Sequence, residues 1–455
     1  MTIRVSEDLK KIASILNEKG FSCYLVGGAV RNQLLGIEEK DYDLATDALP
    51  DDIIRIFRKV IPTGIKHGTV TVLFKGEAYE VTTFRVDGKY TDGRRPDSIS
   101  YTSDINEDLK RRDFTINSIA YDILNEKLID PNNGLSDLDK KTIRAIGNPD
   151  ERFQEDGLRP LRACRFAAQL NFDLENETFK AIGRNLDKFR IVSKERIYDE
   201  LVKTMKARKP STTFRLLLES GLLEIISPDL TACSGLEQRE KHKLDVFEHL
   251  ITTCDYCPQN DIDLRFAGLF HDIGKKDALV FNSEGIPTFH NHEIHSARKA
   301  VKIMKNLKFP NKSIQRIEHL IRHHMFNYES IWTDAGVRRF IARVGLDQID
   351  DLLTLQKADM ASMWTSDEDY DLLKELKNRI DNLTEKNQAF TIKSLNINGN
   401  DLFMDGGIPR SPVMGQILES LLELVLENPD YNDRDFLLAR AREIYENYTE
   451  SVEER

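Results

Sequence analysis

Asp41 and Asp43 stand one residue apart in the sequence, shortly after the glycine pair Gly27-Gly28. Alternate side chains of a β-strand point to the same face, so a strand here would hold both carboxylates side by side. Carboxylate oxygens are the ligands that hard divalent cations such as Mg²⁺ prefer. Two such cations can activate an attacking hydroxyl and support a leaving pyrophosphate, so the pair predicts phosphoryl-transfer chemistry.

The residues before this pair could bind a phosphate. Residues 23–26 predict a buried strand and residues 29–35 predict a helix, with the two glycines between them. Glycine lets the backbone approach a ligand closely, and the N–H groups that begin a helix attract an anion. Arg31 adds positive charge in the first turn. Each piece alone would also fit an ordinary strand-to-helix turn followed by solvated acids, and it is their order that favours a nucleotide site.

Length and composition limit the class of protein. A chain of 455 residues allows two to four domains with their own cores. No apolar run approaches the roughly 18 residues of a membrane span, and the N-terminus lacks a signal-peptide core, so we expect a cytoplasmic protein that does not bind membranes. Five cysteines, an odd number, favour reduced thiols over disulfides. Cys254 and Cys257 lack the second pair that a structural zinc site needs.

The net charge of −11 does not by itself indicate nucleic-acid binding, because contacts to phosphate come from Lys and Arg. Basic residues are concentrated between residues 85 and 208, so an RNA-binding surface would have to be local. A cluster of this kind is also compatible with an ordinary solvated face.

The hydrophobic pattern changes along the chain. Residues 1–145 mix helix and strand. Residues 68–74 and 77–84 alternate as the two strands of a hairpin, so we expect a small mixed sheet in this part of the chain. Beyond about residue 147, apolar residues recur at helical spacing. The clearest predicted helices are residues 9–19, 158–170, 197–205 and 213–222. Residues 85–97 are polar and contain glycine, which predicts a long irregular loop rather than a strand.

Four ordered motifs resemble those of one family. They are Gly27-Gly28-Ala29-Val30-Arg31 with Asp41-x-Asp43, then Arg111-Arg112-Asp113, then Glu155-Asp156-x-x-Arg159 followed by Arg162 and Arg165, then Glu195-Arg196-x-x-x-Glu200. This series resembles the class II tRNA nucleotidyltransferases, the CCA-adding enzymes, whose relatives include bacterial poly(A) polymerases.

The resemblance implies an α+β fold in which a small mixed sheet, like that of DNA polymerase β, is followed by an extended all-α part. It implies a catalytic domain at residues 1–146, a helical neck that selects the nucleotide and binds RNA at 147–230, an HD domain at 231–372 and a C-terminal helical region at 373–455.

The resemblance also assigns roles to single residues. Asp41 and Asp43 would be the catalytic metal ligands, with Mg²⁺ as the cofactor. Glu80 stands where relatives place a third acid on a neighbouring strand, although alternation alone could also expose it. Gly28, Arg31, Arg112, Arg162 and Arg165 would belong to the nucleotide-binding site. The implied partners are tRNA, CTP and ATP, and the sequence leaves the oligomeric state open.

Asp156 and Arg159 would select the base. Cytosine and adenine each present an exocyclic amine beside a ring-nitrogen acceptor, so one carboxylate and one guanidinium can pair with either base. Uracil and guanine reverse this pattern and would leave buried polar groups unpaired. Pro160 fits only the first turn of a helix, so we expect a helix that begins near Arg159 or bends there.

The predicted loop of residues 85–97 bears on the product. In the resembled family a flexible loop at this place is needed for the terminal A, and enzymes that add only CC have a shorter one. The full length here favours complete CCA addition.

A second set of residues resembles the HD phosphohydrolase superfamily. His249, the pair His271-Asp272 and Asp359 are the core match and would bind a divalent metal. The additional candidates are His295 and His323, ahead of His324, His290 and His292. Imidazole and carboxylate together suit Mn, Fe, Ni, Co or Zn, and extra histidines could hold a second ion. Such a site would hydrolyse terminal or 2′,3′-cyclic phosphates, unless the fold is retained without catalysis.

Two alternatives to CCA addition remain from the sequence. A poly(A) polymerase is the nearest, although such enzymes commonly carry a basic C-terminal extension and this sequence ends in Glu-Ser-Val-Glu-Glu-Arg. The other is a phosphohydrolase driven by the HD part, with the N-terminal domain sensing a nucleotide. The intact pair Asp41 and Asp43 disfavours it, because a sensor would not require metal ligands.

Overall fold

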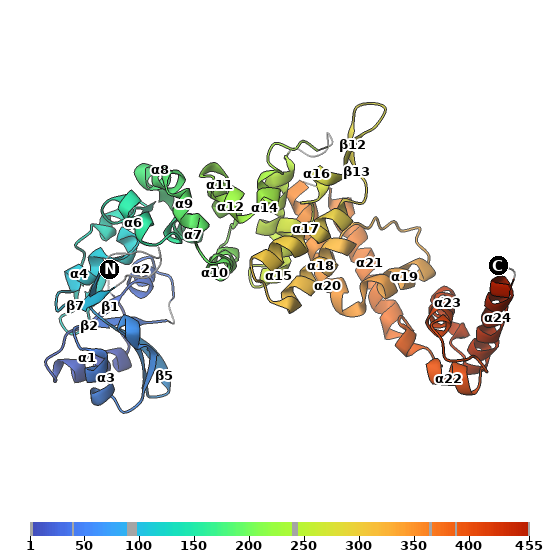
Figure 1. The fold of residues 1–455 in the computed structure, drawn as a ribbon, viewed down its shortest axis with the longest axis horizontal. Helices are drawn as coiled ribbons and strands as arrows, with labels where there is room; N and C mark the ends of the chain where they lie inside the picture. Colours follow the sequence, from blue (N-terminus) through green and yellow to red (C-terminus); the bar gives the residue numbers. More distant parts are fainter. Residues whose placement is uncertain are drawn as a thin grey trace. The chain divides into compact units, whose positions relative to one another are not determined.

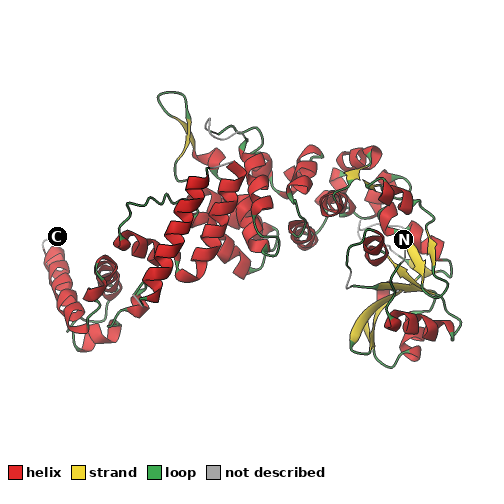
Figure 2. Ribbon diagram, turned by 180° about the vertical axis from the view of Figure 1, so that it is seen from behind, coloured by secondary structure: helices red, strands yellow, loops and turns green. Residues whose placement is uncertain are grey.

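The computed structural model describes residues 3–38, 41–88, 98–238, 244–363, 366–386 and 389–453. The chain forms two compact units. Unit 1 comprises Met1–Leu236, Pro258–Arg265 and Val301–Ile314, and unit 2 comprises Glu237–Cys257, Phe266–Ala300 and Gln315–Arg455. Strands are concentrated in the N-terminal part of the chain, and helices make up most of the rest (Figures 1 and 2). The predicted division into four domains stays a prediction.

One mixed sheet forms the centre of the N-terminal part, as predicted. Within the described residues its strand order is β3-β4-β5-β2-β1-β8-β9. These strands are β1 (Cys23–Val26), β2 (Asp43–Thr46), β3 (Val60–Gly64), β4 (Thr69–Phe74), β5 (Glu77–Thr83), β8 (Ala120–Asp122) and β9 (Lys127–Ile129). Neighbouring strands run antiparallel except β2 and β5, which run parallel.

Helices cover this sheet and continue beyond it. They are α1 (Glu7–Asn17), α2 (Gly28–Leu34), α3 (Pro50–Ile56), α4 (Ile105–Lys110), α5 (Gly134–Asp139), α6 (Pro149–Glu155), α7 (Arg159–Leu170), α8 (Asn176–Arg184), α9 (Leu186–Arg190), α10 (Lys194–Met205), α11 (Ser211–Glu219), α12 (Leu222–Ile226) and α13 (Pro228–Thr231). The short pair β10 (Thr142–Ile143) and β11 (Asp173–Leu174) runs parallel.

Helix α7 begins at Arg159 with Pro160 in its first turn, which is the first of the two arrangements expected from the sequence. Its apolar residues are buried, and it ends at Asn171, which adopts the left-handed conformation that terminates helices. Helix α7 packs against α10 and α11. These contacts fix the direction of its first turn.

From residue 246 onward the chain is almost entirely helical. The helices are α14 (Val246–Tyr256), α15 (Ile262–Phe270), α16 (Lys275–Ala278), α17 (His292–Asn306), α18 (Asn311–His323), α19 (Asp334–Val344), α20 (Leu346–Met363), α21 (Asp367–Glu385), α22 (Gly399–Met404), α23 (Val413–Glu427) and α24 (Arg434–Glu453). In unit 2, α14 packs against α20, and α22, α23 and α24 surround a small apolar core of their own.

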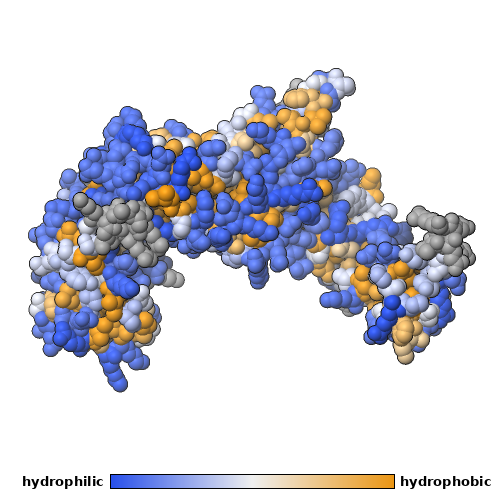
Figure 3. Space-filling view, in the orientation of Figure 1, coloured by the Kyte–Doolittle hydropathy of each residue, from blue (hydrophilic) through white to orange (hydrophobic). Residues whose placement is uncertain are grey.

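A short antiparallel hairpin interrupts this helical part. It consists of β12 (Leu279–Phe281) and β13 (Pro287–Phe289). Val280 and Phe281 are more than 60% exposed, and Figure 3 shows apolar side chains gathered on the hairpin.

Several predicted elements need correction. Residues 85–87, predicted as irregular, form β6 (Arg85–Asp87), whose backbone pairs antiparallel with β7 (Ile99–Tyr101). The pairing uses backbone groups, which a polar side-chain pattern does not reveal. Residues 89–97 of the predicted loop lie outside the described residues. The sequence also did not predict the hairpins β8–β9 and β12–β13, whose strands are only three residues long.

All five cysteines are buried thiols outside any disulfide, which agrees with the prediction of reduced thiols. No helix in the described part of the chain is both long and apolar enough to cross a membrane.

Gly157 lies where two backbones meet. A Cβ atom there would lie 2.3 Å from the carbonyl oxygen of Lys188, at the end of the turn that precedes α7. We predict that Gly157→Ala lowers the free energy of unfolding by about 1–3 kcal/mol, because neither backbone can move without cost. Urea unfolding followed by circular dichroism measures this.

Gly183→Ala is the matched control. Gly183 lies in α8, and a Cβ atom there would have the carbonyl oxygen of Ser220 as its nearest neighbour, 3.7 Å away. Alanine favours a helix over glycine by up to about 1 kcal/mol, so this variant should be unchanged or slightly more stable. Equal unfolding midpoints for the two variants would contradict the close approach at Gly157.

Candidate functional site

A cavity of about 460 Å³ opens in unit 1 between the sheet and helix α7. Its lining combines residues from the first three predicted motifs. The lining residues are Val26, Gly27, Gly28, Arg31, Asp43, Leu44, Glu80, Thr82, Arg111, Arg112, Asp113, Asn117, Asp156, Arg159, Arg162 and Phe166. The volume lies within the range of pockets for small ligands and cofactors.

Two carboxylates lie on neighbouring strands at one side of this cavity. Asp43 is the first residue of β2, and its register partner across the parallel pairing is Glu80 of β5. Both residues are exposed and line the cavity. Asp41 is exposed just before β2 and is not among the lining residues. Among the described residues, no group of three acids here brings its ligand atoms within 4.8 Å of one another.

The turn between β1 and α2 carries the glycines. Gly27 has a φ of 69°, a conformation that side chains other than glycine rarely adopt. A Cβ there would lie 3.0 Å from Nη1 of Arg112 and 3.7 Å from Oδ2 of Asp43. Glycine at this position therefore lets a guanidinium and a carboxylate approach the same point of the backbone.

Two arginines give the cavity positive charge. Arg31 is buried and donates from Nη1 to Oδ1 of Asn117 at 2.5 Å. Arg112 lies 3.5 Å from Oδ2 of the buried Asp108, which also accepts hydrogen bonds from Arg111. Burial lowers the pKa of Arg112, against the opposing effect of Asp108. The cost of burying this cation is thus only partly offset by protein groups, which favours an anionic ligand beside it.

The pair predicted to select the base lies at the start of α7. Asp156 accepts a hydrogen bond from the backbone N–H of Leu158 at 3.0 Å and forms an ion pair with Nη2 of Arg196 at 2.7 Å. Arg159 is buried and donates to the carbonyl oxygens of Arg152 and Arg111. It also forms an ion pair with Glu155. Both side chains are held in place by protein groups while they line the cavity.

Phe166 stands at the centre of an arginine cluster. The guanidinium carbons of Arg165, Arg31 and Arg162 lie 4.0, 5.0 and 5.3 Å from the centre of its ring. Aromatic faces attract cations, so the ring helps to hold three positive charges close together. The sequence did not single out Phe166 or Asn117 as site residues, although both lie within the quoted motifs or directly beside them.

Arg165 differs from its neighbours. It donates from Nε to Oε2 of Glu200 at 2.5 Å, and both residues are buried. Arg165 is not among the residues that line the cavity. Its i+3 spacing from Arg162 turns it partly toward α10, and its predicted place in the nucleotide-binding site stays a prediction.

Asp113 connects the sheet domain with α7. Its Oδ2 accepts hydrogen bonds from Nε and Nη2 of Arg162 at 2.9 and 2.6 Å, and its Oδ1 accepts one from Asn117 at 3.0 Å. Burial alone would raise the pKa of Asp113, but Arg162 and Asn117 hold it well below its usual range. Asp113 is therefore a permanent carboxylate near neutral pH.

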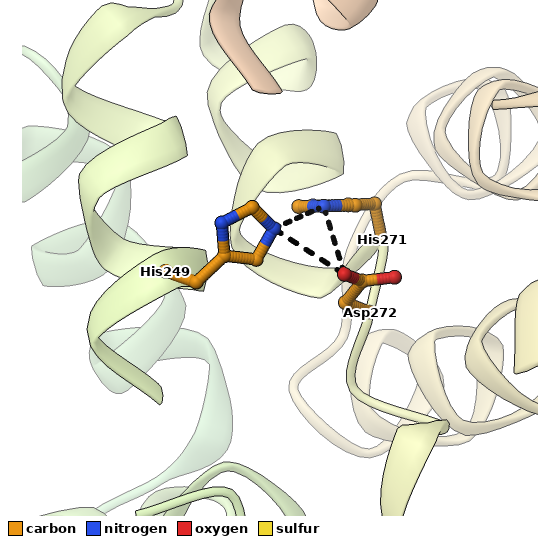
Figure 4. Close-up of side chains that lie close together, drawn as sticks. All are labelled: His249, His271 and Asp272. Atoms are coloured by element: carbon orange, nitrogen blue, oxygen red, sulfur yellow. Dashed lines mark hydrogen bonds and ion pairs between the residues drawn. The ribbon is translucent and has the colours of Figure 1, made fainter. Parts of the chain in front are cut away.

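A second cluster of ionisable residues lies in unit 2, and we call it the His-Asp cluster. It contains His249, His271, Asp272, His292, His324 and Asp359. Figure 4 shows the close contacts among His249 of α14, His271 and Asp272, the last two from the segment that follows α15. Two groups in this cluster have ligand atoms within 4.8 Å of one another: His249, His271 and Asp272, and Asp272, His292 and His324.

Asp359 lies beside the first of these two groups. Its Oδ1 lies 3.1 Å from Nε2 of His249 and 3.4 Å from Nε2 of His271. Burial by itself would lower the pKa of His271, but Asp272 and Asp359 raise it to about 10. This surplus of negative charge attracts a cation, and imidazole and carboxylate ligands fit a divalent transition metal.

Two histidines predicted as extra ligands lie elsewhere. The groups contain His292 and His324 in place of His295 and His323. His323 stacks on His319 at 4.5 Å between ring centres, and burial together with the nearby cations lowers its pKa to about 4. His324, one residue beyond the end of α18, instead donates from Nδ1 to the carbonyl oxygen of Ile321. The assignment of His295 and His323 as ligands stays a prediction.

Comparison with known proteins identifies the family. Residues 23–144 match the model of the poly(A) polymerase head domain, residues 171–233 that of an RNA and SrmB-binding site of polymerase A, and residues 289–441 that of tRNA nucleotidyltransferase domain 2. A CCA-adding enzyme of Ligilactobacillus salivarius is 32% identical over 449 residues, which cover 97% of this chain and 98% of that enzyme. The chain belongs to the CCA-adding enzymes.

Other members of this family agree. A CCA-adding enzyme of Lactobacillus johnsonii is 50% identical over 209 residues, 46% of this chain and 52% of that enzyme. The crystal structure of the Bacillus stearothermophilus CCA-adding enzyme in complex with CTP matches with a TM-score of 0.74 at 28% identity and covers 98% of both chains. The resemblance to class II tRNA nucleotidyltransferases and the α+β fold are thereby confirmed, and the chain is an enzyme of this family.

The ion pair of Asp113 with Arg162 can be tested as a support of the cavity wall. We predict that Asp113→Asn lowers the free energy of unfolding by about 3 kcal/mol, because it leaves a largely buried guanidinium without its carboxylate. Asp150→Asn is the control, since Asp150 pairs with Arg184 and both side chains are 40% or more exposed. Exposed pairs contribute at most about 1 kcal/mol. Denaturant unfolding measures the free energy of unfolding of both variants. Equal losses of stability would contradict the prediction that the buried pair of Asp113 and Arg162 contributes more than the exposed pair.

Proposed function

We propose that this chain adds C, C and A to the 3′ ends of tRNA from CTP and ATP, with Mg²⁺ held by Asp41 and Asp43. The observation that carries the proposal is the lining of one cavity by Asp43, Arg112, Asp156 and Arg159. One bound nucleotide could therefore meet a carboxylate that holds the metal, a guanidinium for its phosphates, and the pair of Asp156 and Arg159 for its base. Relatives support the partners, since solved CCA-adding enzymes are in complex with CTP, ATP or tRNA.

The chain's own residues would bind the two ends of the nucleotide. Arg112 beside Gly27, together with Arg31, offers guanidinium groups to the triphosphate, and the glycine leaves room for close approach. The buried cations need no reorganisation when the nucleotide arrives, because Asn117, Asp108 and Phe166 already hold them.

Asp156 and Arg159 would read the base. Arg196 fixes the carboxylate of Asp156 at 2.7 Å, so this acceptor has a defined direction. A fixed acceptor and a fixed donor can pair with cytosine or adenine and leave polar groups unpaired against uracil or guanine. The chain would therefore need no nucleic-acid template.

The residues present fit magnesium at the other end. Asp43 and Glu80 are register partners on parallel strands and line the cavity, and Asp41 stands two residues before Asp43, outside the lining. Their carboxylates are the oxygen ligands that Mg²⁺ prefers. When bound, Mg²⁺ would polarise the attacking 3′ hydroxyl and neutralise the charge of the leaving pyrophosphate. The cytoplasmic location expected from the sequence stays a prediction.

The main test uses purified protein and a tRNA that lacks its 3′ end. With CTP alone we expect two added residues, and with CTP and ATP a complete CCA end, as sized on a gel. Asp43→Ala should reduce the rate by about 10²- to 10³-fold, the scale seen for the loss of one preorganised group at a reaction centre. Glu77→Ala is the control, because Glu77 is an exposed acid on the same strand as Glu80 and lies outside the cavity lining.

Different products would point elsewhere. Long A tails with ATP would favour a poly(A) polymerase. Unchanged incorporation by Asp43→Ala would contradict the role of this carboxylate.

A second activity is favoured by the His-Asp cluster. We infer that this cluster is a metal-dependent phosphohydrolase site, which would act on terminal or 2′,3′-cyclic phosphates. The buried atoms Oδ1 of Asp272, Nε2 of His292 and Oδ1 of Asp359 have no hydrogen-bond partner, although such atoms are costly to bury unless something binds them. A bound transition metal would supply a Lewis acid and an activated water.

The test of this activity uses p-nitrophenyl phosphate and 2′,3′-cyclic AMP with Mn²⁺, Co²⁺ or Ni²⁺. The wild type should hydrolyse at least one of them, chelation should stop hydrolysis, and His271→Ala and Asp272→Ala should lack the activity while they still incorporate CTP. If the wild type hydrolyses neither substrate with any of these metals, the site is not a phosphohydrolase.

A further inference from the structure

Asn117 is one of the residues that line the cavity of unit 1. Its Oδ1 accepts a hydrogen bond from Nη1 of Arg31 at 2.5 Å, and its Nδ2 donates one to Oδ1 of Asp113 at 3.0 Å. Its main-chain carbonyl oxygen accepts a hydrogen bond from Nη1 of Arg112 at 3.5 Å. One residue therefore contacts both arginines that we propose for the triphosphate, and also the carboxylate that binds Arg162.

The chemistry of these neighbours explains why an amide stands at this position. A guanidinium only donates hydrogen bonds, and an ionised carboxylate only accepts them. The group between Arg31 and Asp113 must therefore offer one acceptor and one donor, which also fixes the direction in which the amide of Asn117 is turned. Because an amide is neutral, it can direct the guanidinium of Arg31 without cancelling the positive charge that a phosphate would meet.

The backbone at Asn117 is held by close packing. Asn117 ends the short 3₁₀ helix η2 (Thr115–Asn117), which packs against α5. The hydroxyl of Thr115 donates a hydrogen bond to Asp137 of α5 at 2.7 Å, and a Cβ atom at Gly134 would lie 2.3 Å from the carbonyl oxygen of Thr115. The side chain of Asn117 is itself buried. Its amide therefore has a defined position before a nucleotide arrives.

The described contacts of Arg31 also include Asn32 and Phe166. Oδ1 of Asn32, the next residue of α2, accepts hydrogen bonds from Nε and Nη2 of Arg31 at 3.0 and 2.8 Å. The ring centre of Phe166 lies 5.0 Å from the guanidinium carbon. Asn32 belongs to the same helix as Arg31 and would move with it. Asn117 instead connects the guanidinium to η2 and, through Asp113 and Arg162, to α7.

We propose that Asn117 is a positioning residue that aims Arg31 at the triphosphate of the bound nucleotide. Asn117 acts through Arg31, so it strengthens the binding of CTP and ATP by the same factor. This inference rests on the proposed function and deepens it, because it names the group that sets the direction of a phosphate-binding arginine. The main-chain contact with Arg112 does not depend on the side chain, so a substitution of Asn117 tests the link to Arg31.

The experiment measures the dissociation constants of CTP and ATP for the full-length protein by isothermal titration calorimetry. We expect Asn117→Ala to raise both constants by about 10-fold, the usual effect of losing one hydrogen bond to a charged group. Arg31→Ala should raise them at least as much. Because Asn117 acts through Arg31, the double variant should bind no more weakly than Arg31→Ala alone.

Asn185→Ala is the matched control. Asn185 is also buried, donates from Nδ2 to Oδ1 of Asp150 at 2.7 Å and accepts from Nε2 of Gln154 at 2.5 Å. It is not among the residues that line the cavity. Asn185→Ala should lower the stability but leave both dissociation constants unchanged. Circular dichroism and urea unfolding report the folded fraction of each variant, and Asn117→Leu repeats the test with an apolar side chain of similar size.

The outcomes separate the role of Asn117 from the proposed function. Unchanged constants in folded Asn117→Ala and Asn117→Leu would overturn the positioning role, and CTP binding by the wild type would leave the proposed transferase standing. Losses that multiply in the double variant would show that Asn117 does not act through Arg31, and an equal loss in Asn185→Ala would trace the effect to stability; either result overturns the role. A wild type that binds neither nucleotide would contradict the proposed function itself.

Discussion

The ion pair between Asp113 and Arg162 connects the domain of the sheet, which carries Asp43 and Glu80, with helix α7, which begins at Arg159. Asp113 follows Arg112, which faces the turn at Gly27, and Arg162 lies one turn beyond Arg159. Because Asp113 also binds Asn117, which in turn holds Arg31, a single buried carboxylate links the groups that we propose for the base with those that we propose for the phosphates. The distance between the two ends of the nucleotide site therefore depends on this contact.

A buried carboxylate of this kind is costly unless cations surround it. Here the cost is offset by Arg162 and by the amide of Asn117, and the remaining guanidinium groups gather around the ring of Phe166. The cavity wall carries an excess of positive charge, although the net charge of the whole chain is −11. Local placement of Arg residues, rather than the overall charge, would create the attraction for a nucleotide and an RNA end.

Much of the first site could be predicted from the sequence because its parts follow short-range rules. The Gly27-Gly28 turn, the strand that begins at Asp43 and the start of α7 at Arg159 each depend on glycine, alternation or proline. The partner of Arg165 could not be predicted, since Glu200 is 35 positions away in the sequence and belongs to another helix. Phe166 was missed for the same reason, because the three arginines around it come from two elements.

The second site was less predictable. His249, the pair His271-Asp272 and Asp359 follow a known order, and the structure brings them together. His292 and His324 lie at the start of α17 and just beyond the end of α18, where the direction of a side chain depends on how the backbone leaves the helix. The sequence pattern could not distinguish them from His295 and His323, which lie one turn or one residue away.

The burial of all five cysteines has a practical consequence. A thiol that solvent cannot reach reacts slowly with maleimides or other alkylating reagents. A cysteine introduced on the surface would therefore be the preferred point of attachment for a fluorophore or spin label, without prior removal of the natural ones. The native chain is in this sense ready for spectroscopic labelling, and a dye placed near the mouth of the cavity could follow the arrival of a nucleotide in real time.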